Sequence, residues 1–591
     1  HEAAHRHHGA VTMASPRTLA ALGALFALAA CGGGGGGTSA PPPPPAASTD
    51  AVLSVSLAGG ATPGIDHLWV TVTGAAMHAD ATRVYGDGDP GWVVMTLPTP
   101  VTLDLSDPAL ANGASVSLIR QSVSTLGTYA QLRLLLAPSD PSLAPLASAT
   151  AKGLLFNEQV QYTDANGAHV VPLEVPDAQG GLRVLMPFTL SADTTTPLSI
   201  EWSPEHSLVR RAATGGGADR FTLRNELQGY NQTLLTALSD GNLQIGGSIF
   251  DSISGQLDTT QFCTGASHTG CIHDVVATAT SLSADKRFFA EARTVSVAAD
   301  GSFELYPLPS QFAYDVVIRG GNMETIVVHG VVVDPTGILK PAPTALSSKA
   351  TPIVPVLDSG ERAVTVTNAL APTSSRVFFG QTIAGTGGAG ADVPYEIVSG
   401  AADPATGRLL YPVTLPGGPL HYASFNSTTD GNGTPPAFTT VTPVEGAGAW
   451  STWSQGTLAT TTSATAPLSS GATTVAAPQP VAAAGFTTGT LTVTLAGTAS
   501  SGADHAELIV ANDGGVVSVV DVSSQIASHG GSTTINVPSG SSSSAPGAAI
   551  YAVSVRTWTG STEGASAHWS RTGAPVDLST SATANVNLVL P

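Results

Sequence analysis

The sequence predicts an all-β protein: tandem antiparallel β-sandwich domains behind a flexible N-terminal tether. Three observations predict this class. Apolar residues alternate with polar ones along many short segments, which is typical of half-buried strands. Gly- and Asp-rich turn signals separate these segments. The 591 residues include 65 glycines and 42 prolines, too many helix breakers for long helices.

The alternating segments recur along most of the chain. The clearest segments have these apolar faces: Leu53, Val55 and Leu57; Leu68, Val70 and Val72; Val101, Leu103 and Leu105; Leu132, Leu134 and Leu136; Tyr314, Val316 and Ile318; Leu491, Val493 and Leu495; Tyr551, Val553 and Val555. Stacked antiparallel sheets bury such faces against one another.

The N-terminus has the pattern of a bacterial lipoprotein signal. Residues 1–12 are interpreted as a leader that is not part of the native protein, and residues 13–30 as a signal peptide with an apolar run too short to span a membrane. The run ends in Leu28-Ala-Ala-Cys31, which resembles a lipobox and implies lipidation of Cys31. The alternative is an ordinary secretory signal with a chance cysteine. Because Gly32 follows the cysteine instead of Asp, the outer membrane is the expected location.

The first five residues, His1-Glu-Ala-Ala-His5, fit the H-E-x-x-H pattern of zinc proteases. They precede a signal that is removed, so we expect no zinc site there.

Composition divides the rest of the chain. A Gly- and Pro-rich tether covers 31–51, and β domains are expected at 52–236, 240–335, 361–456 and 486–591. Residues 335–360 and 457–485 are rich in Ala, Pro, Ser or Thr and are interpreted as linkers.

One internal repeat links the first and last domains. Residues 53–67 align without a gap on 491–505, and nine of the 15 positions are identical. Each copy ends in Asp-His. The expected unit is a strand, a glycine-bearing loop and a second strand, used twice, so the last domain is expected to be a partial repeat of the first.

The first domain resembles domain of unknown function 4382 of bacterial lipoproteins. The strings that carry the resemblance are Leu53–Leu57, Asp66-His67-Leu-Trp-Val-Thr-Val-Thr, Gly91-Trp92-Val93, Leu103-Asp104-Leu105, Gly127-Thr-Tyr-Ala-Gln131-Leu-Arg133-Leu and Leu198-Ser-Ile-Glu-Trp. The usual Asp-Ala-Pro after the first strand is absent, and the family brings no known activity.

Residues 243–335 resemble a carboxypeptidase-regulatory-like (transthyretin-like) sandwich. The matching strings are Asp300-Gly301-Ser-Phe303-Glu-Leu, Leu308-Pro309 and Tyr314-Asp-Val-Val-Ile. The resemblance implies a non-catalytic spacer or binding module, and immunoglobulin-like or transthyretin-like sandwiches are expected overall.

Cys263 and Cys271 are the only cysteines after Cys31. In an oxidising envelope they predict a disulfide. The alternative is a Cys2His2 zinc site with His268 and His273, which lacks the usual C-x2-C spacing. The prediction is a disulfide and no metal.

Other candidate sites have simpler explanations. Asp66-His67 and Asp504-His505 are not expected to be acid–base pairs, because adjacent strand residues point to opposite faces. They are expected to cap the strands that follow the loops. The acidic loops with Asp87, Asp89 and Asp430 are expected to be hydrogen-bonded turns and not calcium sites. Glu201 and Glu205 are not expected to form a glycosidase pair. The tryptophans considered for stacking on sugars are mostly expected to be core or strand-edge aromatics: Trp92, Trp450, Trp453, Trp558 and Trp569.

No nucleophile elbow, Walker loop or dinucleotide fingerprint occurs in the sequence. The formal net charge of −20 argues against nucleic-acid binding. The expected function is a non-enzymatic, lipid-anchored cell-envelope protein without cofactors or catalytic residues. It is expected to contact the membrane through its lipid anchor and to contact a protein or glycan partner. Its expected role is binding, adhesion or structural support at the cell surface. The alternative is a glycan-directed envelope hydrolase built from scattered carboxylates.

Overall fold

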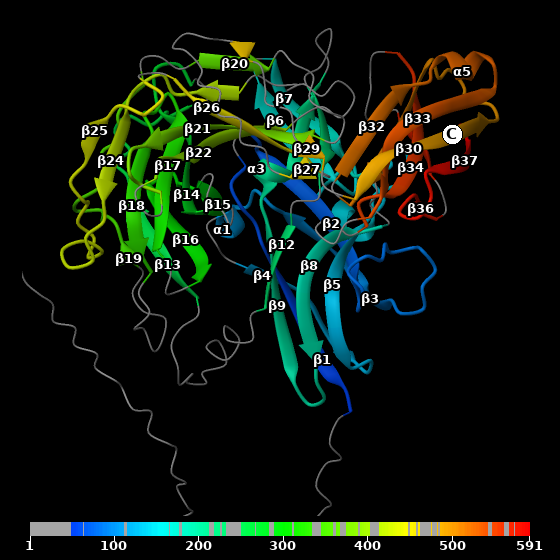
Figure 1. The fold of residues 1–591 in the computed structure, drawn as a ribbon, viewed down its shortest axis with the longest axis horizontal. Helices are drawn as coiled ribbons and strands as arrows, with labels where there is room; N and C mark the ends of the chain where they lie inside the picture. The colour runs from blue at the N-terminus through cyan, green and yellow to red at the C-terminus, as the bar shows by residue number, and fades with distance from the viewer. Residues whose placement is uncertain are drawn as a thin grey trace, which may run out of the picture. The chain divides into compact units, whose positions relative to one another are not determined.

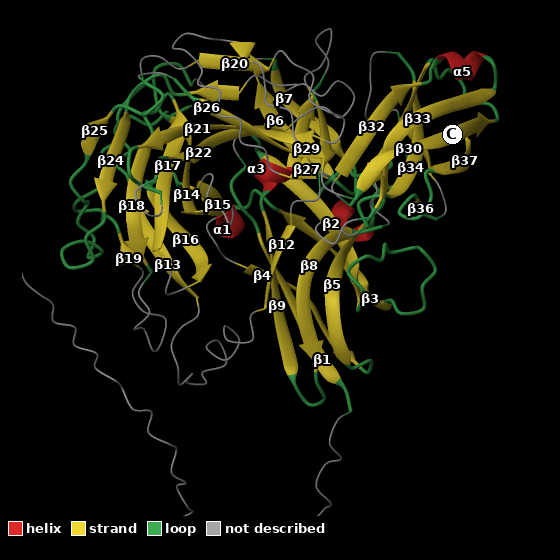
Figure 2. Cartoon of the chain, in the orientation of Figure 1, coloured by secondary structure: helices red, strands yellow, loops and turns green. Residues whose placement is uncertain are grey.

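The computed structural model consists almost entirely of β-strands and turns (Figure 1), and its few helices are one turn long (Figure 2). It describes residues 49–591 except 63, 112–114, 165, 177–179, 212–217, 225–226, 232–249, 266–267, 283–288, 310–312, 334–343, 359–361, 367–373, 388–390, 402–412, 447–448, 457–458, 461–473, 476–480, 483–484, 514, 542–546, 561–566 and 572–573. The leader, the signal, Cys31 and most of the tether lie outside these residues. No helix among the described residues is long and apolar enough to cross a membrane. The all-β prediction is confirmed.

The first β-region, residues 51–231, contains two sheets. Their strand orders are β12-β9-β1-β4 and β10-β11-β7-β6-β2-β5-β8, and β3 pairs with β2. The bounds are β1 (Ala51–Ala58), β2 (His67–His78), β3 (Val93–Asp104), α1 (Pro108–Ala111), β4 (Ser115–Val123), β5 (Gly127–Leu136), α2 (Ala147–Ala151), β6 (Gln159–Asp164), β7 (Gly167–Glu174), β8 (Leu182–Leu190), β9 (Thr195–Trp202), α3 (Pro204–Ser207), β10 (Leu208–Arg211), β11 (Arg220–Leu223) and β12 (Leu227–Asn231). The predicted apolar faces form its core: Leu53, Val55 and Leu57 are fully buried.

The second β-region covers residues 250–456. A small sheet has the order β16-β13-β19, and a nine-stranded sheet has the order β25-β24-β18-β17-β14-β15-β22-β21-β26. The bounds are β13 (Phe250–Gln256), β14 (His273–Leu282), β15 (Phe289–Ser296), β16 (Ser302–Pro309), β17 (Ala313–Gly321), β18 (Ile326–Val332), β19 (Thr344–Ala345), β21 (Ser374–Ile383), β22 (Val393–Ala401), β24 (Leu420–Ser424), β25 (Thr439–Val441) and β26 (Ser451–Gly456).

This nine-stranded sheet corrects the expected boundary between 240–335 and 361–456. Strand β18 pairs in parallel with β24, and Phe289 of β15 pairs with Tyr395 of β22, so the two segments share one sheet. The intervening residues also contribute to the core, because Leu346 and Ile353 are buried. The composition of residues 335–360 suggested a linker because Leu346 and Ile353 stand among many Pro, Ala and Ser residues.

The expected linker at 457–485 contains short strands. Strand β20 (Arg362–Val366) pairs with β23 (Val413–Leu415) and with β28 (Thr474–Val475), and β27 (Ala459–Thr460) pairs with β29 (Val481–Ala482). These pieces are two to five residues long.

The C-terminal β-region, residues 486–591, forms a three-stranded sheet β33-β30-β37 and a second sheet β32-β31-β34-β35, with β36 beside β34. The bounds are β30 (Phe486–Ala496), β31 (His505–Asn512), β32 (Gly515–Asp521), α5 (Ser524–Ala527), β33 (Gly530–Gly540), β34 (Ile550–Trp558), β35 (His568–Arg571), β36 (Val576–Asp577) and β37 (Thr583–Val589).

The two copies of the repeat occupy the same topological positions. The opening strands β1 and β30 each pair antiparallel with a strand that follows a one-turn helix, β4 or β33, and parallel with a late strand, β9 or β37. The second strands β2 and β31 each pair with the next strand, β3 or β32, and then with β5 or β34. The sequence repeat therefore corresponds to a repeated strand plan.

Candidate functional site

A disulfide joins Cys263 to Cys271 just before strand β14. The two Cα atoms lie 5.1 Å apart, and the bond confirms the pairing predicted from the sequence. Because both sulfur atoms are in the bond, neither cysteine is a thiolate ligand. The alternative Cys2His2 zinc site is therefore wrong.

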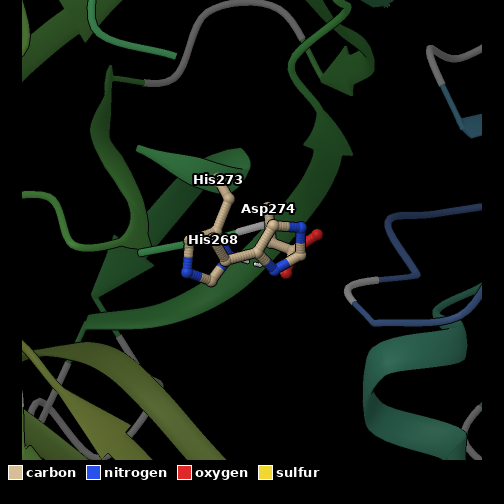
Figure 3. Close-up of side chains that lie close together, drawn as sticks. All are labelled: His268, His273 and Asp274. Atoms are coloured by element: carbon tan, nitrogen blue, oxygen red, sulfur yellow. Dashed lines mark hydrogen bonds and ion pairs between the residues drawn. The ribbon is translucent and has the colours of Figure 1, made fainter. Parts of the chain in front are cut away.

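Two histidines and an aspartate meet beside this disulfide (Figure 3). His268 belongs to the closed loop, His273 is the first residue of β14, and Asp274 follows it. The two imidazole rings stack with centroids 4.1 Å apart and 15° between their planes. Nδ1 of His273 lies 3.0 Å from Oδ2 of Asp274. One potential ligand atom from each of the three side chains lies within 4.8 Å of the other two.

Asp274 reaches the same side as His273 because β14 begins with an irregularity. Adjacent residues of a regular strand point to opposite faces. Asp274 instead has a φ of 48°, and the pairing of β14 with β17 shifts between His273 and Val276. A bulge of this kind re-aims a side chain. Sequence reasoning grouped the histidines with the cysteines and missed Asp274, whose position depends on this bulge.

The turn at the end of β17 supports the cluster. Gly321 pairs with His273, and a Cβ atom on Gly321 would overlap the imidazole, so only glycine leaves room for the ring here. Nδ2 of Asn322 donates hydrogen bonds to the carbonyl oxygens of His268, at 2.8 Å, and Cys271, at 3.1 Å. The loop is thus fixed by the disulfide on one side and by Asn322 on the other.

The charge of Asp274 is stabilised locally. Desolvation alone would raise the pKa of this carboxyl. The hydrogen bond with His273, the charges of His273 and His268 and a backbone hydrogen bond from Gly64 together outweigh it and lower the pKa of Asp274. Two imidazoles and an ionised carboxylate are a donor set that binds divalent transition metals.

A second histidine–carboxylate cluster surrounds Asp315 of β17. Oδ2 of Asp315 accepts a hydrogen bond from the hydroxyl of Tyr395 at 2.5 Å and lies 2.8 Å from Nδ1 of His329. The backbone N–H of Gly330 donates to Oδ1 at 2.7 Å. The hydrogen bond with Asp315 raises the pKa of His329, against the opposing effect of desolvation. Burial, reinforced by Asp315, raises the pKa of Tyr395.

Buried arginines join the first and last β-regions. The fully buried side chain of Arg133, in the Gly-Thr-Tyr-x-Gln-x-Arg string, donates to Oδ1 of Asp513 at 2.7 Å, and Arg183 lies 3.0 Å from the other oxygen. In the opposite direction, Nη1 of the fully buried Arg556 donates to Oε1 of Glu174 at 2.7 Å. Each of these β-regions thus supplies an arginine that donates to a carboxylate of the other, and Arg556 also donates to Glu507 of its own region at 2.7 Å.

These carboxylates are ionised because the arginines surround them. Burial opposes ionisation of Glu174, but Arg220 and Arg556 lower its pKa to about 2. The pKa of Asp513 is lowered in the same way, by Arg133 and Arg183 against burial. Buried charges persist only when they are paired in this manner.

The Asp-His dipeptides lie at the starts of β2 and β31, and in neither one is the aspartate within hydrogen-bond distance of its neighbouring histidine. His67 lies 2.6 Å from Asp104 and not against Asp66, whose carboxylate accepts a hydrogen bond from Thr163. Asp504 accepts from the backbone N–H of Gly560 at 2.8 Å, and its oxygen is 3.6 Å from His505, beyond hydrogen-bond distance.

The acidic loops are internally bonded turns. Asp87 accepts from the N–H of Asp89, and Asp89 accepts from the N–H of Gly91. In the other loop Asp430 accepts from the N–H of Asn426 at 2.7 Å. These bonds are the turn chemistry that the sequence predicts.

Glu201, one of the two carboxylates considered for a glycosidase pair, is bonded to an arginine. Its Oε1 accepts a hydrogen bond at 2.5 Å from Nη1 of the buried Arg293. The side chain of Glu205 lies outside the described part of the chain.

Most of the tryptophans considered for sugar stacking belong to the core. Trp450, Trp453 and Trp558 are buried, whereas Trp92 and Trp569 are partly buried. Trp92 packs against His78 and Tyr85.

Comparison with known families gives one match. Residues 51–224 match the family described as Domain of unknown function (DUF4382). This confirms the resemblance of the first β-region, and Arg133 and Glu174 lie inside the matched segment. No curated protein matches the chain.

The solved structures similar to this chain include two with low sequence identity. The Bacillus anthracis TIE protein is 10% identical, with 91% of this chain and 74% of that chain covered and a TM-score of 0.13. A streptococcal ancillary pilin is 11% identical, with 73% and 99% covered and a TM-score of 0.12. TM-scores this low support no argument about shared architecture or function.

Proposed function

We propose that this chain is a non-enzymatic, lipid-anchored protein of the bacterial cell envelope, in which the β-regions bind a protein or glycan partner. The observation that carries the proposal is that its buried carboxylates are paired with arginines. Glu174, Glu201 and Asp513 are each held by buried arginines, so they support the packing of β-regions. A catalytic acid or base needs a proton-transfer path to substrate, which a carboxylate locked between arginines lacks.

The anchor rests on the sequence before Ala51. Lipidation of Cys31 and the tether that follows would place the β-regions outside the outer membrane or facing the periplasm. Mass spectrometry of the mature protein should find an acylated N-terminal Cys31, and Cys31→Ser should block processing. An unmodified terminus at another residue would contradict the anchor.

The proposal includes a carboxypeptidase-regulatory-like role for residues 243–335, as a spacer or binding module. Two features of the described residues support it. Gly301 has a φ of 87° in the predicted tight turn, where Asp300 accepts hydrogen bonds from Ser302. Phe303, which follows the turn, enters the core with 4% of its surface exposed.

A hydrolase screen tests the non-enzymatic proposal. Glycan, ester and peptide substrates should show no turnover by the purified protein, and glycan and protein arrays should show binding. The best base for an enzyme is His329, because Asp315 holds its Nδ1 while a third of its side chain is exposed. Robust turnover that disappears in His329→Ala would overturn the proposal in favour of the envelope hydrolase.

Binding is expected to come from loops at the sheet ends, which vary without disturbing the strands. Pro90 and Thr428 are exposed in the two acidic loops. Alanine at these positions should weaken partner binding while the Tm stays within a few degrees. Unchanged binding in both variants would exclude these loops as the contact surface.

A further inference from the structure

We propose that His268, His273 and Asp274 form a binding site for one divalent transition-metal ion, of the Cu²⁺ and Zn²⁺ class. The site is separate from the buried arginine pairs and from any partner-binding loop proposed above. Its three side chains are the only group of three or more His, Cys, Asp or Glu residues within the described ranges whose potential ligand atoms lie within 4.8 Å of one another.

The donor set selects the class of metal. Imidazole nitrogens suit Cu, Zn and Ni, whereas Ca²⁺ and Mg²⁺ prefer oxygen ligands alone. The cysteines nearest the cluster are in the disulfide, so the soft thiolates that favour Cu(I) are absent from the set. Two imidazoles with one carboxylate therefore favour a divalent ion of borderline softness.

The distances suit two adjacent ligands of a tetragonal or octahedral ion. Nδ1 of His273 and Oδ2 of Asp274 are 3.0 Å apart, and at metal–ligand distances of about 2.1 Å such a pair subtends about 90°. His268 is exposed on its loop, so its ring is free to turn from the stacked position toward a shared ion. Water would complete the coordination, since Asp274 is also open to solvent.

The surrounding residues pre-form the site. The disulfide and the two hydrogen bonds from Asn322 fix the backbone of the loop, and Gly321 leaves room for the ring of His273. Asp274 keeps a left-handed φ of 48°, an uncommon conformation for a residue other than glycine. Supports of this kind typically change metal affinity by about 10- to 100-fold.

The leader complicates any binding measurement, because His1, His5, His7 and His8 would bind the same metals. The test therefore uses the full oxidised chain with these four histidines replaced by alanine. Titration calorimetry with Cu²⁺ and separately with Zn²⁺ should show one ion bound per chain, with Cu²⁺ tighter, as the Irving–Williams order requires.

Variants identify the ligands. His268→Ala and His273→Ala should each raise the Kd for Cu²⁺ by about tenfold or more, and the double variant should remove the site. Asp274→Asn keeps a residue that tolerates the left-handed backbone and should also weaken binding by about tenfold. His568→Ala, at an exposed histidine of β35, is the matched control and should bind as the parent does.

Electron paramagnetic resonance of the Cu²⁺ complex gives an independent readout. The parent should show coupling to two nitrogen ligands, and each single histidine variant to one. Absence of stoichiometric binding in the parent, or an unchanged Kd and spectrum in the double histidine variant, would overturn the proposal. Circular dichroism of every variant should match the parent, because the substituted side chains are exposed or partly exposed.

Discussion

Two histidine–carboxylate clusters lie in the second β-region, and their surroundings differ. Around Asp315, the carboxylate is 5% exposed and takes hydrogen bonds from Tyr395, His329 and the backbone of Gly330. Around Asp274, the carboxylate is 39% exposed, lies 3.0 Å from Nδ1 of His273, and also accepts a backbone hydrogen bond from Gly64.

The difference in exposure and in the number of hydrogen bonds separates the structural cluster around Asp315 from the accessible cluster around Asp274. Asp315 brings together β17, β18 and β22, and its hydrogen bonds are part of the packing that joins 240–335 to 361–456. The cluster around Asp274 joins a disulfide loop to the start of one strand, and its three residues are exposed or partly exposed. The same residue types therefore stabilise the fold in one place and remain accessible to a ligand in the other.

Removal of Asp315 should produce the largest effect. Asp315→Ala would leave the buried Tyr395 hydroxyl and the Gly330 amide without their acceptor, at a cost of about 2–4 kcal/mol. Urea unfolding combined with hydrogen exchange in β17, β18 and β22 measures this loss. Asp274→Asn, which tolerates the left-handed φ of 48°, is the control, and an equal loss in both variants would erase the distinction between the clusters.

Loss of the disulfide should rank second. The Cys263→Ser/Cys271→Ser double variant should lower stability by roughly 2–3 kcal/mol in the chain-entropy model. Faster hydrogen exchange should be confined to the loop and the start of β14. The same variant should bind Cu²⁺ more weakly, because the histidines lose their fixed spacing; unchanged affinity would mean that the disulfide does not organise the cluster.

A pH titration should reveal the raised pKa of His329. The hydrogen bond with Asp315 favours protonated His329 in the folded state, so its stabilising contribution is complete below the unfolded pKa of about 6.5. That contribution should be lost as the pH rises through the folded pKa. Thermal unfolding between pH 6 and pH 9 should therefore show a smaller decline for His329→Gln than for the parent, and identical slopes would contradict the assignment.

The smallest effect is expected at Asp274. Asp274→Asn should change the free energy of unfolding by no more than about 0.5 kcal/mol, because its ion pair with His273 is partly exposed. Denaturant unfolding at pH 7 tests this. A loss above about 2 kcal/mol would mean that Asp274, like Asp315, is a structural residue.

The sequence allowed prediction of features that depend on local pattern. Alternation placed Leu53, Val55 and Leu57 in the core, and the oxidising compartment together with the spacing predicted the bond between Cys263 and Cys271. The repeat 53–67 and 491–505 pointed to a shared strand plan, which the pairing of β1 and β30 displays.

Features that depend on long-range pairing were not predictable in this way. Asp315 and Tyr395 are 80 residues apart, and only the parallel pairing of β15 with β22 brings their strands into one sheet. Asp274 joins His273 through a bulge that no sequence pattern marks. The buried partner of Arg133 is 380 residues further along the chain, so the motif residue alone gave no indication of it.

This last separation has a consequence for how the protein is made. At about 5–20 residues per second, synthesis of the 380 residues between Arg133 and Asp513 takes roughly 20–80 s. During that time the guanidinium of Arg133 lacks the carboxylate of Asp513, and Glu174, which pairs with Arg220 of its own β-region, lacks its second arginine, Arg556. The first β-region is therefore expected to complete its packing only after the last one has emerged, so a ribosome that stalls before residue 513 would release a chain vulnerable to proteolysis.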